Sequence, residues 1–454
     1  MTPLKLAGAA LLLTFFSAGA CNYDIVNPNS PGVIGDNPSA SLVGTAARGI
    51  LLATRQDVAD WALDGAIYGR EAYRIDPADP RFVTEMMQGP LDPGSRAFGG
   101  DHWLEPYSAI RSANDLLAVI GTASSLTPEQ QSAVSGFAHT LQAYNFMIIL
   151  DSHNQDQIPI DVGRDASAPP ATLVTSAEAW AHVATLLDQG AAELLGLAFP
   201  FTLPPGFAGF DSTATFLKFN RALRARVAVY RGDFANALTY LTQSFLDPAA
   251  PLDRGVYMDF GTGPGDLANP LAVNALTSEN FGHPSLRTQA QLQPGGAPDN
   301  RFLSKLVTRP PRSGGTTDTD PVQQISSDLG WIRYNSPSTP IPLIKNEELI
   351  LLRAEANIGL GPGTFAAAVT DINTVRQTSG GLAPYAGLVD QPSLLAELLY
   401  NKRYSLMYEG AHSWIDYRRY GLTATLQSFD RVGPPPDLIF PTLPIPTAET
   451  QPRT

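Results

Sequence analysis

The chain has 454 residues, a net charge of −13 and a single cysteine. This charge argues against nucleic acid as a partner and against attachment to anionic lipid by charge alone, because both need a basic surface. The length suits one large domain or two ordinary ones, and the 39 glycines and 39 prolines predict long ordered loops between helices.

Residues 1–20 have the pattern of a secretory signal peptide. Lys5 precedes a short uncharged apolar run, which is too short to span a bilayer and ends in small residues directly before Cys21. An ordinary signal peptidase can cut after these small residues and leave a soluble protein with an incidental thiol. The same residues resemble a bacterial lipobox, with Ala18 where leucine is commoner. Because no second cysteine exists to form a disulfide, we expect Cys21 to be lipidated and residues 21–40 to form a tether.

Helical periodicity dominates the chain after the tether. A first helix is expected over 42–61, and Trp103 and Tyr107 begin a helical stripe that continues to Leu117. Capping boxes at Thr127 and Thr175 predict two helix starts. Further helices are expected over 216–230, 235–245, 346–360 and 365–378.

The last four helices form two antiparallel pairs, each of which resembles a tetratricopeptide unit. We therefore predict a mainly all-α fold whose helical scaffold consists of residues 41–246 and 345–420. Residues 247–344 are dense in proline and glycine, which predicts a long loop-rich insertion with short strands at best. A proline-rich stretch predicts an extended tail over 429–454.

Catalytic motifs are missing from the sequence. It has no Gly-x-Ser-x-Gly and no His-Glu-x-x-His, so we assign no catalytic residue and no cofactor. Asp151, His153, Asp156 and Asp161 allow either a hard-cation site or a solvated loop, and no metal site is assigned. Two distant carboxylates for glycoside hydrolysis stay open, because such partners meet only in three dimensions.

Motifs along nearly the whole chain resemble the SusD/RagB family of outer-membrane nutrient-uptake lipoproteins. The matching residues are Trp103-x-x-x-Tyr107-x-x-Ile110-x-x-x-Asn114, Arg353-Ala354-Glu355-Ala356-Asn357, Ile372-Asn373-x-Val375-Arg376, Tyr408-Glu409-Gly410 and Asp416-Tyr417-Arg418-Arg419. The chain departs from the family pattern at Asn401-Lys402, where glutamate is usual, at Ser405, which replaces an acidic residue, and at His412-Ser413. Because these positions belong to an expected buried ion-pair network, we expect compensating substitutions nearby.

The resemblance implies one SusD-like domain over residues 41–454, anchored by lipid at the outer membrane and without catalysis. It implies capture of an oligosaccharide or a peptide and delivery to a SusC-type TonB-dependent transporter. Two alternatives remain: a secreted glycan-active enzyme, and a tetratricopeptide assembly lipoprotein without a small ligand.

Glycan capture needs flat aromatic faces with polar side chains beside them, and loops on a stiff frame are their natural carriers. The candidate ligand-binding residues are Tyr68, Tyr73, Arg74, Phe98, Trp331, Arg333 and Tyr334, with Trp61 and Phe82 in the same stretches. Trp103, Tyr107, Trp180 and Trp414 lie on helical stripes and are expected in the core. The arginines near Arg74 are expected to be solvated charge or to hold an acidic sugar or a peptide carboxylate.

Overall fold

The structure is a computed structural model that describes residues 34–154, 156–163, 167–194, 198–313, 325–427 and 437–453. The predicted signal peptide, Cys21 and most of the tether lie outside the described residues, so lipidation of Cys21 stays a prediction. Ile34–Thr454 form one compact unit. None of the described helices is both long and apolar enough to cross a membrane.

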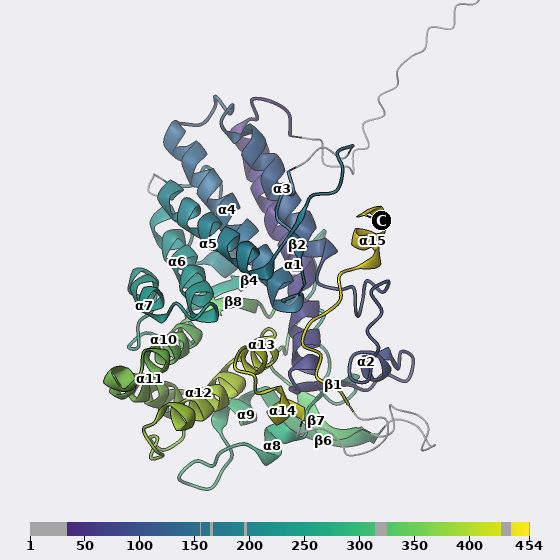
Figure 1. The fold of residues 1–454 in the computed structure, drawn as a ribbon, viewed down its shortest axis with the longest axis vertical. Helices are drawn as coiled ribbons and strands as arrows, with labels where there is room; N and C mark the ends of the chain where they lie inside the picture. Colours follow the sequence, from purple (N-terminus) through teal and green to yellow (C-terminus); the bar gives the residue numbers. More distant parts are fainter. Residues whose placement is uncertain are drawn as a thin grey trace, which may run out of the picture. The chain divides into compact units, whose positions relative to one another are not determined.

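Four long helices make up the first part of the scaffold (Figure 1). They are α1 (Ala40–Tyr68), α3 (Leu104–Ile120), α4 (Pro128–Ser152) and α5 (Ser176–Glu193). Both predicted capping boxes are confirmed, because the Thr127 and Thr175 hydroxyls each accept a hydrogen bond from the backbone N–H three residues later, and the side chain there accepts one in return. Helix α4 packs against α1, α3, α5 and α6, and all its residues from 140 to 152 are buried.

The two predicted helix pairs are also confirmed. They are α6 (Thr213–Tyr230) with α7 (Phe234–Gln243), and α10 (Asn346–Leu360) with α11 (Phe365–Thr378). Gly232 and Gly361, at φ 74° and 102°, adopt the left-handed backbone that closes each turn. Helix α7 contacts α10, so the two pairs stack, and α12 (Gln391–Leu406) packs on α10 and α11 before the chain reaches α13 (His412–Arg419). The expectation of a mainly helical fold is therefore correct.

Short strands and short helices occupy the segment between α7 and α10. They are β4 (Gly255–Met258), β5 (Asn280–Gly282), α8 (Ser285–Thr288), α9 (Asn300–Lys305), β6 (Leu306–Ser313), β7 (Ser326–Trp331) and β8 (Ile341–Lys345). Strands β4 and β8 pair antiparallel, with a bulge where the register moves from Ile344 to Pro342, a residue that has no N–H to donate. Strand β5 pairs with β1 (Ala72–Arg74) in a sheet of order β1-β5-β7-β6, which ties this segment to the end of α1.

The smaller elements lie near the ends and the loops of the scaffold. They are α2 (Arg81–Thr84), β2 (Ile158–Pro159), which pairs with β3 (Leu173–Val174), α14 (Thr423–Gln427), α15 (Thr447–Thr450), and 3-10 turns at Pro205–Phe207, Pro362–Thr364 and Gln451–Arg453.

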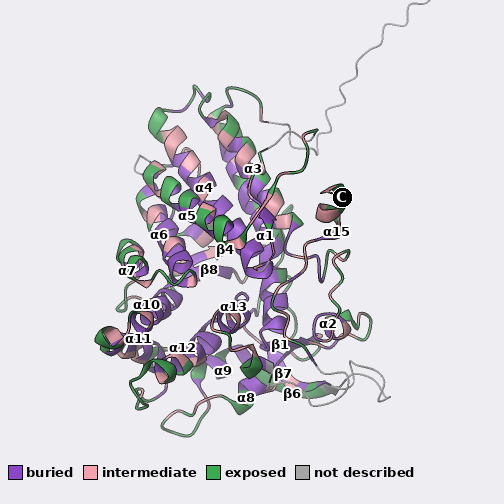
Figure 2. Ribbon diagram, in the orientation of Figure 1, coloured by how far each residue is buried: buried purple, intermediate pink, exposed green. Residues whose placement is uncertain are grey.

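Most buried apolar side chains form one continuous core that runs from α1 through α4 and α6 to α13 (Figure 2). Trp414 of α13 is fully buried and stacks on Tyr68 at the end of α1, with 4.8 Å between ring centroids. A smaller core lies between α10, α11 and α12, around Ile350, Ile372 and Leu398.

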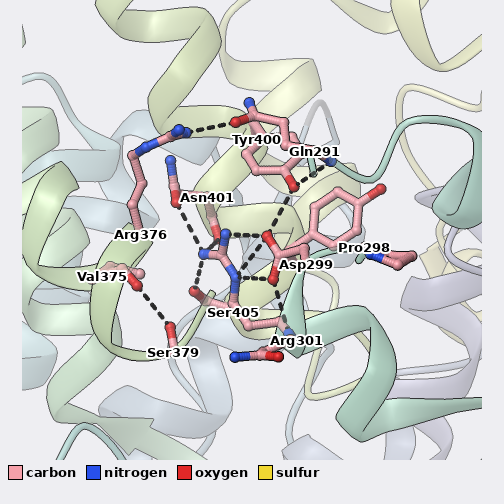
Figure 3. Close-up of polar contacts among 12 residues, drawn as sticks. Gln291, Pro298, Asp299, Arg301, Val375, Arg376, Ser379, Tyr400, Asn401 and Ser405 are labelled. Atoms are coloured by element: carbon pink, nitrogen blue, oxygen red, sulfur yellow. Dashed lines mark hydrogen bonds and ion pairs between the residues drawn. The ribbon is translucent and has the colours of Figure 1, made fainter. Parts of the chain in front are cut away.

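A buried polar network joins α9 to α12 (Figure 3). The Arg301 guanidinium donates to Asn401 Oδ1 at 2.9 Å and to Ser405 Oγ at 3.0 Å, and its charge is balanced by Asp299, whose Oδ1 lies 2.9 Å from Nε. Tyr400 also donates to Asp299, at 2.8 Å. Asp299 thus balances the buried charge of Arg301, whereas the expected compensation for the departures at Asn401 and Ser405 stays a prediction.

Candidate ligand-binding site

A groove of about 540 Å³ lies beside the start of α3. Its walls come from residues 96–107, from residues 159–162 and 168–171, and from the C-terminal segment between 446 and 453. The Tyr107 hydroxyl donates to Pro159 O at 2.8 Å, and the Thr447 N–H donates to Pro93 O at 2.9 Å. These bonds hold the three segments together around a space within the range of about 300–1,000 Å³ that is typical of small-ligand sites.

Two aromatic rings belong to the floor of the groove. Trp103 is the N-cap residue of α3, and Tyr107 follows one turn later, with 5.1 Å between the two ring centroids. Trp103 also packs against the edge of His153, at 4.9 Å. Burial raises the pKa of Tyr107 well above its usual range, so its hydroxyl stays protonated and remains a donor to the loop. Trp103 is buried as expected, whereas Tyr107 is only half-buried and contributes part of its ring to the groove.

Prolines and charged side chains complete the walls and the rim. The prolines in the lining are Pro159, Pro169, Pro170, Pro446 and Pro452, and the charged residues are Arg96, Asp161, Glu449 and Arg453. Arg453 forms an ion pair with Glu449 and donates to Ala171 O, which ties the C-terminal segment to the opposite wall. A mostly apolar floor with a few convergent polar groups is the usual make-up of a small-molecule site.

Five of the seven candidate ligand-binding residues are buried aromatics. Tyr68, Tyr73, Phe98, Trp331 and Tyr334 are each no more than 4% exposed. Their rings pack on other side chains instead of facing solvent. A sugar ring needs an open aromatic face, so in this structure none of the five offers one. Among the described residues, every exposed large apolar side chain is a leucine or a valine.

Trp331, Arg333 and Tyr334 do lie close together, but around the interior residues Tyr408 and Glu409. The Trp331 ring stacks on Tyr408, with 4.2 Å between centroids and 11° between planes. The Tyr334 hydroxyl donates to the Tyr408 carbonyl at 2.8 Å, and Arg333 Nε donates to Glu409 at 2.9 Å. This cluster joins the strand segment to the end of α12 and is part of the core.

Arg74 and Phe98 belong to a second cluster, which reaches the surface. The guanidinium of Arg74 lies 4.2 Å from the ring centroid of Phe82, and that of Arg81 lies 4.5 Å from the ring centroid of Phe98. The two phenylalanine rings pack edge to face at 5.0 Å. The arginines also pair with Asp76 and Asp79, at 3.1 and 2.7 Å, so their charges are already partnered.

The residues considered as a hard-cation site are not brought together. Asp151 is buried beside Arg418, and burial raises the pKa of its carboxyl to about 7. The His153 ring lies between two backbone carbonyls, those of Leu443 at 3.0 Å and Asp101 at 3.2 Å. Asp161, in contrast, lines the groove.

A different set of ligand-type side chains does converge. Asp57 of α1 meets Asp101 and His102 of the loop before α3, and one ligand atom from each lies within 4.8 Å of the others. Burial raises the pKa of Asp101 to about 7. Burial also opposes protonation of His102, but the charges of Asp57 and Asp101 outweigh it and raise the pKa of the imidazole well above its usual range.

The sequence could not single out the groove. Trp103 and Tyr107 fit a core stripe, and the other two walls lie far from them in the chain. The available signal was the position of Trp103 three residues after Gly100, because a residue that starts a helix lies at the edge of a packed layer.

Comparisons with known proteins connect this fold to solved structures. A SusD superfamily protein from Bacteroides vulgatus matches with a TM-score of 0.67 and 13% identity, over 92% of this chain and 98% of its own. A laminarin-binding SusD-like protein matches with a TM-score of 0.64 and 16% identity, over 92% of this chain and 98% of its own. Surface glycan-binding protein A from Bacteroides uniformis matches with a TM-score of 0.60 and 16% identity, over 82% of this chain and 86% of its own. No protein-family model and no curated protein matches the sequence.

Proposed function

Because the chain has the SusD-like fold, we propose that it is a surface lipoprotein that captures an oligosaccharide and delivers it to a TonB-dependent transporter. One protein of this fold is named a laminarin-binding protein and another a surface glycan-binding protein, which supports a glycan over a peptide. The proposed role is binding without catalysis, which differs from the secreted glycan-active enzyme considered as an alternative.

The observation that carries the proposal is the groove beside α3. Its lining offers the half-buried ring of Tyr107 and several prolines, which suit the apolar face of a sugar ring. Its rim offers Asp161, Glu449 and two arginines, which can bond to sugar hydroxyls. A tetratricopeptide assembly protein without a small ligand would have no need for such a groove.

Binding should be measured by isothermal titration calorimetry against a panel of soluble polysaccharides that includes laminarin, with a peptide mixture as the second arm. Tyr107→Ala removes the ring and should weaken glycan binding about tenfold or more, since a central aromatic contact contributes about 2 kcal/mol. Tyr107→Phe keeps the ring and loses only the bond to Pro159, so it should bind nearly as tightly as the unaltered protein.

The matched control is Tyr240→Ala. Tyr240 is a half-buried tyrosine of α7 that lies under Arg224, outside the groove lining. Its loss should leave glycan affinity unchanged. If no polysaccharide binds, or if Tyr107→Ala and Tyr240→Ala bind alike, this groove is not the glycan site.

The anchor and the transporter partner need separate experiments. Cys21→Ser should leave folding and glycan affinity intact but abolish uptake, because the helical body would no longer be held at the membrane. Normal growth of a Cys21→Ser strain on the bound glycan would contradict the anchor. A pull-down of the native protein from outer membranes should recover a large β-barrel transporter, and its absence would contradict the partner.

A further inference from the structure

The carboxylates and the imidazole around His102 form a compact buried cluster between α1 and the loop that precedes α3. Asp57 and His102 are 2% and 0% exposed, and Asp57 Oδ1 lies 2.9 Å from His102 Nδ1. On the other side of the ring, Asp64 Oδ2 lies 3.4 Å from Nε2. Asp101 is half-buried, and its Oδ1 accepts a hydrogen bond from the backbone N–H of His102 at 2.7 Å.

This cluster has more negative charge than its protein partners balance. Within the described part of the chain, His102 is the only cationic side chain that forms an ion pair with Asp57 or Asp64. Arg74 of β1 forms its ion pair with Asp76, and its charge reaches Asp64 only at longer range. Buried carboxylates are normally paired with a cation or bound to a metal, so two of them and the half-buried Asp101 around one imidazole are unusual.

Besides Nε2 of His102, which faces Asp64 at 3.4 Å, two further buried polar atoms of the cluster lack a hydrogen-bond partner among the described residues. One is the second oxygen of Asp57, Oδ2. The other is the hydroxyl of Tyr68, a 1% exposed side chain that lies within electrostatic reach of Asp64 and Asp101. Leaving such groups unsatisfied is unfavourable, and a bound ion with its water would offset this cost.

We propose that Asp57, Asp101 and His102 bind a divalent transition-metal ion of the Zn²⁺ class. One ligand atom from each residue lies within 4.8 Å of the others. Ligands bound to one tetrahedral zinc ion at about 2.0–2.2 Å are about 3.3–3.6 Å apart, so side-chain movements of about 1 Å bring the three into range. Water completes the coordination, since three protein ligands leave a fourth position open.

The ligand set selects the class of ion. Calcium and magnesium prefer oxygen ligands alone, whereas zinc accepts imidazole nitrogen together with carboxylate oxygen. When Nδ1 of His102 binds the ion, its Nε2–H points toward Asp64, in the arrangement by which a carboxylate orients a metal-binding histidine.

The location gives the ion a role in ordering the groove. His102 has a left-handed backbone, with φ 56°, and the residues on either side of the Asp101–His102 pair, Gly100 and Trp103, line the groove. Metal binding would hold this strained loop against α1. This site does not depend on whether the groove binds a glycan.

The test uses the full-length protein, purified in detergent, treated with EDTA and dialysed. Titration with Zn²⁺ by calorimetry should give one ion per chain, and Zn²⁺ should raise the thermal unfolding midpoint. Asp57→Asn should weaken Zn²⁺ binding about tenfold or more. Asp115→Asn, the same change at an exposed aspartate of α3 that pairs with Arg111, should leave binding unchanged.

Co²⁺ added to the unaltered protein gives a reading that does not depend on any variant folding. It should produce the visible absorption bands of a four- or five-coordinate site, and one equivalent of Zn²⁺ should remove them. Absence of saturable Zn²⁺ binding, Ca²⁺ binding as tight as that of Zn²⁺, or equal Zn²⁺ affinity in Asp57→Asn and Asp115→Asn would each overturn the proposal.

Discussion

The strongest stability prediction concerns Lys402, one of the residues at which the chain departs from the pattern of the family it resembles. Its side chain is 2% exposed, and Nζ lies 2.8 Å from Glu355 and 2.7 Å from Asp416. Arg419 reaches the same two carboxylates at 2.9 and 3.0 Å. Burial alone would raise the pKa of Glu355, but Lys402 and Arg419 outweigh it and hold that pKa at about 2.

Lys402→Met keeps the volume of the side chain and removes only its charge. Two buried carboxylates then share a single cation, Arg419. Removing one partner of a buried ion pair costs about 3–5 kcal/mol, because the charge left behind is desolvated without compensation. That loss is a large part of the 5–15 kcal/mol or so that stabilises a typical domain.

Urea denaturation followed by circular dichroism measures this loss. The matched control is Lys218→Met, at an exposed position of α6, which should change the free energy of unfolding by no more than about 0.5 kcal/mol. Adding Asp416→Asn to Lys402→Met should recover part of the loss, since one buried charge disappears. If Lys402→Met and Lys218→Met have the same effect, the buried pairs do not stabilise this fold.

Three further predictions test the helices and the pH dependence. Gly65→Ala would place a Cβ 2.4 Å from Ala411 Cβ and should destabilise the protein by about 1–3 kcal/mol. Gly49→Ala, on the same helix with open space around it, should stabilise the protein by up to about 1 kcal/mol. Urea denaturation measures both changes. Thr175→Ala removes the cap of α5 and should lower the unfolding free energy by about 1 kcal/mol. Burial raises the pKa of Glu71 from 4.5 to about 8, so the folded state holds a proton that the unfolded chain loses. Stability should therefore fall as pH rises from 4.5 to 8, and Glu71→Gln should flatten that slope in denaturation series across pH.

The helices could be predicted from the sequence because their signals are local. The hydroxyl of Thr127 and the side chain of Gln130 are three residues apart, and the contacts of each capping box stay within one turn. The helix pairs follow for the same reason, since α6 and α7 are joined by a short turn at Gly232. Periodicity and capping therefore determine these elements before any tertiary contact forms.

The aromatic candidates could not be sorted in this way. Tyr73 packs on His283, with 4.5 Å between ring centroids, and Trp331 stacks on Tyr408. Each partner lies tens to hundreds of residues away along the chain. A loop-like sequence around Tyr73 gives no sign that β1 will pair with β5, and this pairing is what takes the ring out of solvent. Exposure of an aromatic ring is a property of the tertiary fold.

The loop from 93 to 103 links the features on which the proposed function depends. Its first residue, Pro93, accepts a hydrogen bond from Thr447, so the C-terminal wall of the groove is held by the same loop that ends in Trp103. Asp101 and His102 lie between these two points and face Asp57 on α1. A change that loosens the His102 cluster should therefore weaken ligand binding in the groove without touching its lining. Deleting the C-terminal segment should weaken ligand binding as well but leave Zn²⁺ binding intact, because none of the three proposed metal ligands lies in that segment.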